Sequence, residues 1–175
     1  MSFQTIIYEE DGPIGWIKLN RPDDGNMFTH VTCHEIRDLI NDIRRETRTR
    51  VIVFTGAGDR FFCIGGRKEG MEETMLYAGT LPTLDMYDSI DRLQKPTIAM
   101  VNGYCFGGGF IPLCACDFAI AAEEATFGLS EVNWGILPGG LVSKVVTMTM
   151  NYRKSMYYAM TGDPFDGKVA EEIGL

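Results

Sequence analysis

The stretch KPTIAMVNGYCFGGGF, residues 95–110, joins an apolar segment to three adjacent glycines. Its β-branched and apolar residues predict a strand over residues 97–104, and a glycine-rich corner and a short helix are expected to follow. A glycine inside a regular element costs about 0.5–1 kcal/mol relative to alanine, because glycine loses more backbone freedom on folding. Three glycines together therefore indicate a special requirement on the backbone.

The rest of the chain alternates between strand-like and helix-like patterns. Strands are predicted at residues 4–9, 14–19 and 51–56, in the FFCI segment after residue 60, and in CDFAIAA and ATFGLSE. Helices are predicted at residues 31–46, 81–93, near 140–160 and at 165–173. This alternation predicts an α/β fold with mostly parallel strands and crossover helices. No repeat or linker is present, so a single domain over residues 1–175 is expected.

Composition limits the classes of partner and compartment. The 175 residues carry a formal net charge of −8 and no Lys/Arg-rich block, which argues against a nucleic-acid partner. The N-terminus turns acidic before any apolar segment, and Pro112 and Asp117 interrupt the longest apolar run. Neither a signal peptide nor a membrane span is expected. Five cysteines, an odd number, predict reduced and mostly buried thiols in a cytoplasmic protein.

Two glycine clusters follow predicted strands: Gly65-Gly66 and the triplet Gly107 to Gly109. Neither has the spacing of a dinucleotide-binding loop or of a P-loop. A glycine-rich corner exposes backbone N–H groups, and two such corners facing each other can hold a carbonyl oxygen in an oxyanion hole. The alternative is that these glycines only permit tight turns and close packing. Spacing alone leaves both interpretations open.

Several segments, taken in order, resemble the crotonase family of CoA-thioester enzymes, the enoyl-CoA hydratases and isomerases. They are LNRPDD at 19–24, GAGDRFFCIGG at 56–66, and the block from Lys95 to Gly140. The resemblance implies the family's ββα spiral and an acyl-CoA substrate, with CoA as part of the thioester and no separate cofactor. The chain ends where the family's C-terminal helices begin, so that part is expected to be absent. A homo-trimer or hexamer is expected only if the native protein has those helices.

The resemblance also assigns the reacting groups. Two loop N–H groups polarise the thioester carbonyl in this family, and by position in the motifs they belong here to Gly66 and Gly108. Typical hydratases have two glutamates, but Ile111 occupies one of these positions and Glu131 the other. A single carboxylate can activate a water and deliver a proton to the α-carbon. Apolar neighbours are expected to raise the pKa of Glu131 towards the working pH, which predicts a catalytic acid/base.

The remaining site residues are expected around these groups. The motif positions predict substrate contacts for Ile64, Gly65, Met71, Ile111, Trp134 and Gly139. Contacts to the CoA portion are predicted for Arg21, Met27 and Lys68, and the nearby cations Arg67 and Lys95 are further candidates for its phosphates.

Three functions remain open on the sequence. The first is a hydratase-type lyase that adds or removes water at an α,β-unsaturated acyl-CoA. The patterns GYCFGGGF-x-PL-x-ACD and EATFGLSE-x-NWGI resemble those of hydroxycinnamoyl-CoA hydratase-lyases. The stretch from GGRKEG to LPTLDMYDSI, which includes residues 77–80, instead resembles a branch acting on cyclic acyl-CoAs. Hydration–lysis of an aromatic side chain or C–C hydrolysis of a cyclic acyl-CoA is therefore the second reading. A non-catalytic CoA-binding or assembly protein is the third, because the first glutamate is missing.

No metal site is predicted. His30 and His34 are four residues apart without a third ligand motif, and the spacing of Cys105, Cys114 and Cys116 does not fit a zinc ribbon or finger. Cys63 lies beside the proposed donor, but no histidine is placed to activate its thiol, so packing is expected.

Overall fold

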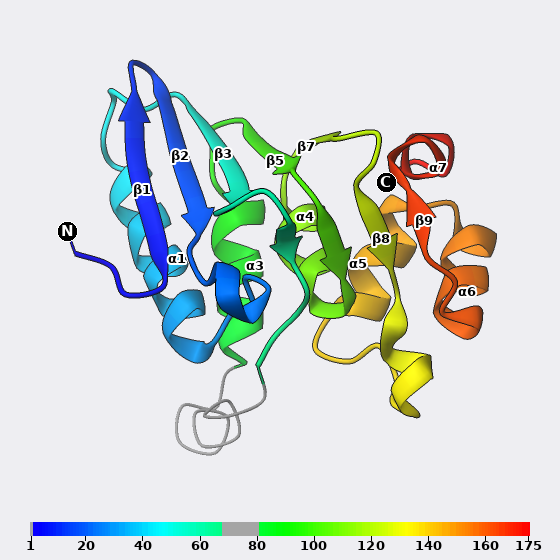
Figure 1. Ribbon diagram of the computed structural model, residues 1–175. Coiled ribbons are helices and arrows are strands. Elements are labelled where there is room, and N and C mark those ends of the chain that lie inside the picture. Colours follow the sequence, from blue (N-terminus) through cyan, green and yellow to red (C-terminus); the bar gives the residue numbers. More distant parts are fainter. Residues whose placement is uncertain (1, 68–80) are drawn as a thin grey trace.

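The computed structural model describes residues 2–67 and 81–175 (Figure 1). The strands are β1 (Ile6–Asp11), β2 (Ile14–Leu19), β3 (Val51–Gly56), β4 (Phe61–Cys63), β5 (Thr97–Val101), β6 (Tyr104–Phe106), β7 (Phe118–Ala121), β8 (Thr126–Gly128) and β9 (Phe165–Asp166). The α-helices are α1 (His30–Ile43), α3 (Pro82–Asp91), α4 (Phe110–Ala115), α5 (Val142–Thr149), α6 (Tyr152–Thr161) and α7 (Gly167–Glu172). Three 3₁₀ turns are η1 (Pro22–Asp24), η2 (Gly107–Gly109) and η3 (Ser130–Trp134).

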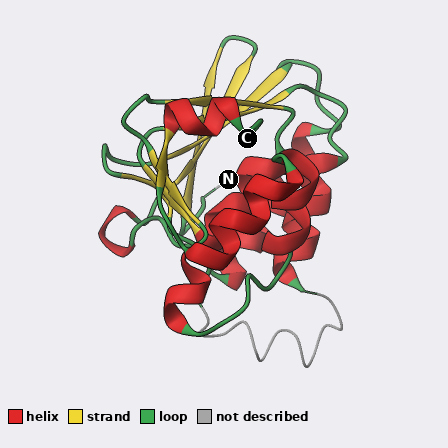
Figure 2. Ribbon diagram, turned by 90° about the vertical axis from the view of Figure 1, so that its right-hand side faces the viewer, coloured by secondary structure: helices red, strands yellow, loops and turns green. Residues whose placement is uncertain are grey.

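The described strands form two sheets. Five strands pair in the order β1-β2-β3-β5-β7, and only β1 and β2 are antiparallel. The other four pair in the order β4-β6-β8-β9, with only β8 and β9 antiparallel. Figure 2 shows most of the helices gathered on one side of the strands. The predicted α/β fold with mostly parallel strands is confirmed.

The predicted strand over residues 97–104 is in fact two strands that belong to different sheets. Between them, the Asn102 side chain donates to the carbonyl oxygens of Gly56 (3.1 Å) and Gly58 (2.9 Å). A side chain at Gly103 would overlap the carbonyl of Arg60. The chain therefore crosses from the first sheet to the second at this close approach, and the continuous strand predicted from the apolar pattern is corrected.

Lys95 closes the C-terminal end of helix α1, which begins at a capping box built on Thr29. Its Nζ donates to the carbonyl oxygens of Ile43 (2.6 Å), Glu46 (2.8 Å) and Thr49 (2.7 Å). The Ile43 carbonyl belongs to the last turn of α1, whereas Glu46 and Thr49 lie in the segment that follows, so the cation joins the helix end to that segment. The expectation that Lys95 contacts CoA phosphates is therefore wrong.

The helix predicted near residues 140–160 is two helices, α5 and α6. The backbone is extended at Met150, and the Asn151 side chain then caps α6 by accepting from the N–H of Arg153 at 3.1 Å. A residue that can cap a helix interrupts an apolar pattern that otherwise continues through both helices.

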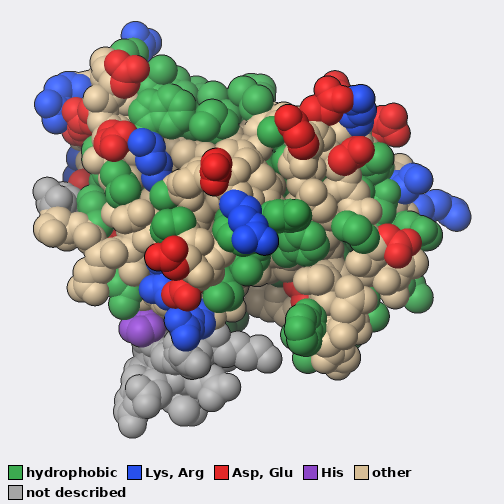
Figure 3. Space-filling view, in the orientation of Figure 1, with side chains coloured by type: hydrophobic (Ala, Val, Ile, Leu, Met, Phe, Trp, Pro, Cys, Tyr) green, Lys and Arg blue, Asp and Glu red, His purple; other side chains and the backbone are tan. Residues whose placement is uncertain are grey.

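Figure 3 shows acidic and basic side chains interspersed over one face of the molecule. None of the helices among the described residues has the length and apolarity that crossing a membrane requires.

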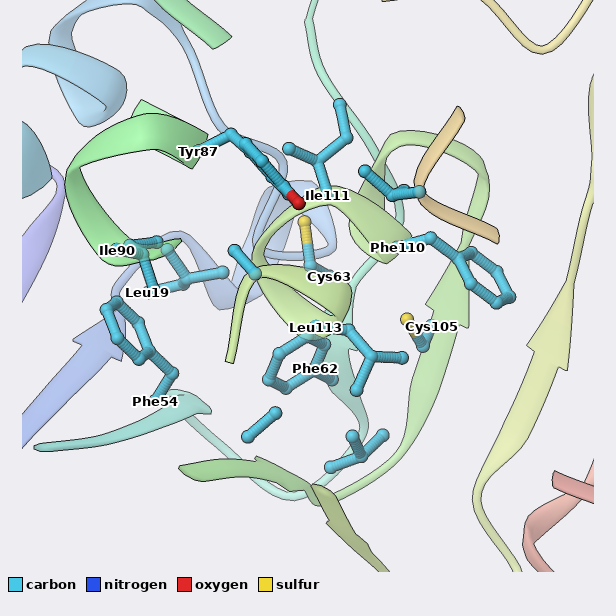
Figure 4. Packing of buried hydrophobic residues seen from close by; sticks show 14 of the residues in the cluster. Leu19, Phe54, Phe62, Cys63, Tyr87, Ile90, Cys105, Phe110, Ile111 and Leu113 are labelled. Carbon is cyan, nitrogen blue, oxygen red and sulfur yellow. The ribbon is translucent and has the colours of Figure 1, made fainter. Parts of the chain in front are cut away.

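The glycine triplet is joined to a tightly packed part of the core (Figure 4). The buried side chains around it are Phe62, Cys63, Cys105, Phe110, Ile111 and Leu113, each at most 3% exposed. Such interiors are packed as densely as organic crystals, so the corner formed by the triplet is held rigidly in place.

Candidate active site

The three glycines of η2 are required for three different reasons. Gly107 has a φ of +51°, in the left-handed region that favours glycine. A Cβ on Gly108 would lie 3.0 Å from the backbone nitrogen of Gly66, so the two glycine clusters face each other. A Cβ on Gly109 would overlap the carbonyl of Cys63. Close packing therefore accounts for Gly109, whereas Gly108 belongs to the meeting point of the two corners.

The second corner leaves its own amide available. Phe28 and Gly66 form an isolated parallel bridge, in which Phe28 N–H donates to Gly65 O (3.0 Å) and Arg67 N–H donates to Phe28 O (2.9 Å). These bonds use the neighbours of Gly66, so the N–H of Gly66 itself points away from Phe28. Gly66 is exposed, and a Cβ on Gly65 would lie 3.2 Å from the amide nitrogen of Gly108.

Gly108 is the second residue of a 3₁₀ turn, and the first N–H groups of a helix have no partner within it. Its backbone lies against that of Gly66, as the Cβ contact above shows. Two amides of this kind at one place are able to donate to a single oxygen atom.

Glu131 lies against the same triplet from η3. Its Oε1 is 3.1 Å from the position that a Cβ on Gly107 would occupy. The residue is only 8% exposed, and Oε2 has no hydrogen-bond partner in the described part of the chain. Burial raises the pKa of the carboxyl group, and a hydrogen bond from the residue's own backbone amide opposes this. A buried carboxylate with one unengaged oxygen is suited to accepting and returning a proton.

Ile111, the second residue of α4, is 2% exposed and belongs to the buried cluster that also contains Tyr87 and Cys63 (Figure 4). An apolar side chain is suited to this position because packed neighbours surround it. Its predicted contact with substrate stays a prediction.

Two neighbouring hollows are lined in part by the same residues. The first, here called the η1 hollow, has a volume of about 610 Å³ and runs from η1 past Met27 to Ile64. The second, the η3 hollow, has a volume of about 560 Å³ and runs from Ile64 to Trp134. Arg60 and Phe61 also line both hollows, so the hollows share a wall that includes Ile64, the residue before Gly65. Met27, Ile64 and Trp134, all predicted from the motifs, are thus brought to one surface.

The cations near these hollows differ in how they are engaged. Asp24 accepts from Arg21 Nη2 and from Arg67 Nη1, the latter at 3.3 Å. Arg60 instead lies over the ring of Phe61, 4.9 Å from its centroid. Among the described residues Arg60 has no ion-pair partner. Sequence reasoning missed this residue, although a basic side chain in the GAGDRFF loop was a usable signal.

Of the other predicted residues, one lies in an exposed loop and several fall outside the part of the chain that the structure describes. Gly139 is exposed in the loop between η3 and α5, and the nearest atom to its Cβ position is Leu137 O at 3.8 Å. Met71, Lys68 and the stretch 77–80 lie outside the described residues. The Arg21 and Gly139 contacts stay predictions.

The thiol of Cys63 is consistent with the packing interpretation. The residue is fully buried, burial raises the pKa of its thiol to about 12, and its Sγ lies 3.6 Å from Gly65 O. No group of three or more potential metal ligands occurs within residues 2–67 and 81–175.

Comparison with known proteins identifies the family. The family model described as enoyl-CoA hydratase/isomerase matches residues 9–175. A hydroxycinnamoyl-CoA hydratase-lyase from Pseudomonas fluorescens is 42% identical over 99% of this chain and 65% of its own length. A crotonyl-CoA hydratase from Syntrophomonas wolfei is 33% identical over 100% of this chain and 68% of its own. The chain thus spans about two thirds of the length of these relatives.

A solved structure of an enoyl-CoA hydratase from Bacillus anthracis superposes with a TM-score of 0.88 at 30% identity. The alignment covers 98% of this chain and 68% of that one. The predicted resemblance and the fold it implies are confirmed. The chain belongs to the enoyl-CoA hydratase/isomerase family.

Proposed function

We propose that this protein adds water to an α,β-unsaturated acyl-CoA, or removes it, with Gly66 and Gly108 as oxyanion donors and Glu131 as the single acid/base. The observation that carries this proposal is the position of the buried Glu131 carboxylate, 3.1 Å from the Cβ position of Gly107, beside two facing backbone amides. Family membership supports the acyl-CoA class of substrate.

The chemistry follows from this arrangement. The thioester oxygen accepts from both amides, which draws electron density from the conjugated double bond towards that oxygen. Glu131 takes a proton from a water as the water oxygen bonds to the β-carbon, and an enolate forms on the thioester. The same carboxyl group then gives the proton to the α-carbon, which returns the enolate to a carbonyl. One water is consumed, and the carboxylate is regenerated.

A second candidate is the hydration and C–C cleavage of an aromatic acyl-CoA. The η3 hollow favours it, because Phe61, Tyr104, Phe106 and Trp134 line this hollow. Aromatic rings stack on planar ligands with a gain beyond that of simple burial. The relative from P. fluorescens carries a name of this kind. The cyclic acyl-CoA alternative rested on the stretch over residues 65–90, of which residues 68–80 lie outside the described part of the chain.

The experiment is a spectrophotometric screen of crotonyl-, feruloyl- and cyclohexenoyl-CoA with the wild type and Glu131→Gln. We expect turnover of at least one thioester, a loss of about 10²–10⁴-fold in kcat for the variant, and little change in affinity for CoA. Loss of C=C absorbance with release of an aldehyde would select the aromatic reaction. Binding of CoA without turnover of any thioester would overturn the proposal in favour of a non-catalytic CoA-binding protein.

A further inference from the structure

Phe28 is the residue that touches both glycine corners. Its backbone holds Gly66 from both sides, by accepting from Arg67 N–H at 2.9 Å and donating to Gly65 O at 3.0 Å. Its ring reaches the other corner, where Cζ is 3.2 Å from the position that a Cβ on Gly108 would occupy. One residue therefore contacts the chain at each of the two amides.

Phe28 is itself held from both sides along the chain. Two residues earlier, the buried Asn26 has a φ of +53°, and its side chain donates to the carbonyl oxygens of Ala57 (3.0 Å) and Phe61 (2.8 Å). One residue later, Thr29 caps helix α1. Phe28 is 2% exposed between these anchors, so neither its backbone nor its ring has room to shift.

We propose that Phe28 is a positioning residue that sets the separation between the Gly66 and Gly108 amides. This inference rests on the proposed oxyanion hole and deepens it. Its backbone bonds fix the direction of the Gly66 N–H, and its ring limits how closely the Gly108 backbone approaches. Two donors act on one oxygen only if both lie at hydrogen-bond distance from the place where negative charge develops. A displacement of about 1 Å is enough to lose about 10²-fold in rate.

The test compares Phe28→Leu with Phe54→Leu. Phe54 is also fully buried, 1% exposed, but it lies on β3 of the five-stranded sheet. Both variants lose a ring from the core and are expected to lose similar stability. For Phe28→Leu we expect kcat to fall about tenfold or more and KM to change much less, because the lost interaction acts in the transition state. Phe54→Leu should keep kcat within about twofold of the wild type.

A spectroscopic readout separates positioning from general destabilisation. The carbonyl stretching frequency of a bound ¹³C-labelled thioester falls when two N–H groups polarise it. This fall should be smaller in Phe28→Leu than in the wild type, whereas Phe54→Leu should show the same fall as the wild type. If Phe28→Leu does not fold, Phe28→Met takes its place, because the unbranched methionine side chain adapts more readily to an irregular space. Equal kcat and equal frequency in the Phe28 and Phe54 variants would overturn the inference while leaving the proposed function intact. A wild type with neither turnover nor a shift would remove the proposed function, and the inference with it.

Discussion

Gly107 is constrained both by its backbone conformation and by the side chain of Glu131. Its φ is +51°, and a Cβ there would meet Glu131 Oε1 at 3.1 Å. Gly12 has a similar backbone conformation, with a φ of +56°, but no atom lies within 4 Å of its Cβ position. The pair allows backbone strain to be separated from displacement of the carboxylate.

Gly107→Ala and Gly12→Ala should each cost about 1–2 kcal/mol of stability, because both place a side chain in the left-handed region. Only Gly107→Ala should also lower kcat, by about 10²-fold, since the added methyl displaces Glu131 from the triplet. Thermal melts and steady-state rates measured on both proteins check this. A Gly107→Ala variant with wild-type kcat would mean that the Glu131 position is not critical.

Glu131 is expected to reduce stability at neutral pH. The pKa of the Glu131 carboxyl group is raised in the folded protein above its value of about 4.5 in the unfolded chain. The folded protein therefore binds this proton more tightly than the unfolded chain does. The stabilisation of the protonated form is therefore complete below the unfolded pKa and is lost as pH rises through the folded pKa. Glu131→Gln, which stays neutral, should melt above the wild type at pH 8, and this difference should shrink towards pH 4. A difference that is constant across this range would contradict the buried, desolvated carboxylate.

Arg60 is the cation that the hollows offer to an anionic group. Arg60→Gln should raise KM for an acyl-CoA about tenfold, because one charge-assisted contact to phosphate is lost. The matched control is Arg92→Gln, since Arg92 pairs with Asp88 on the exposed surface of α3. An acyl-pantetheine thioester, which lacks the nucleotide phosphates, should be affected far less. An equal rise in KM for both thioesters would assign Arg60 to a role other than phosphate binding.

At the scale of the elements, the C-terminal end of helix α1 is held by Lys95, which lies 52 residues after Ile43 in the chain. Lys95→Met removes the donor shared by three carbonyl oxygens and should cost about 3 kcal/mol, because hydrogen bonds to charged groups are stronger than neutral ones. Lys168→Met is the control, because the ion pair of Lys168 with Glu123 is exposed and is worth little. Urea titrations of both variants check the difference. Equal losses would show that Lys95 does not support the helix end.

Most elements could be predicted from local patterns, and the exceptions have physical causes. The apolar run over residues 97–104 gives no sign of the sheet change at Asn102-Gly103, because that change depends on the distant carbonyls of Gly56 and Gly58. Lys95 resembles a surface cation in sequence because its acceptors lie about fifty residues earlier. Long-range backbone contacts of this kind leave no local signal.

On the scale of the whole molecule, the motifs predicted the fold and the meeting of the two glycine corners with Glu131. They did not predict Arg60 or Phe28. The roles expected for both depend on neighbours that only the tertiary structure brings together, namely the two hollows for Arg60 and the facing corners for Phe28. Residue types in a known order therefore predict a chemistry, whereas the residues proposed to hold or orient its groups can be recognised only from the tertiary structure.

One end of the molecule, formed by η3, α5 and α6, with α6 in contact with both of the others, exposes large apolar side chains. They are Val132, Trp134, Met148, Tyr152, Met156, Tyr157 and Met160. Exposed apolar surface of this extent favours association. We expect the chain to self-associate with rising concentration in sedimentation experiments, and Met148→Lys with Met160→Lys to reduce this. A wild-type chain that stays monomeric at its highest attainable concentration would refute the expectation.

The proposed function requires that two backbone amides polarise a thioester beside Glu131. The most direct measurement is the carbonyl stretching frequency of ¹³C-labelled crotonyl-CoA bound to Glu131→Gln, in which turnover is suppressed and the amides are unchanged. We expect a frequency clearly below that of the free thioester. A saturated complex with the frequency of the free thioester would contradict it.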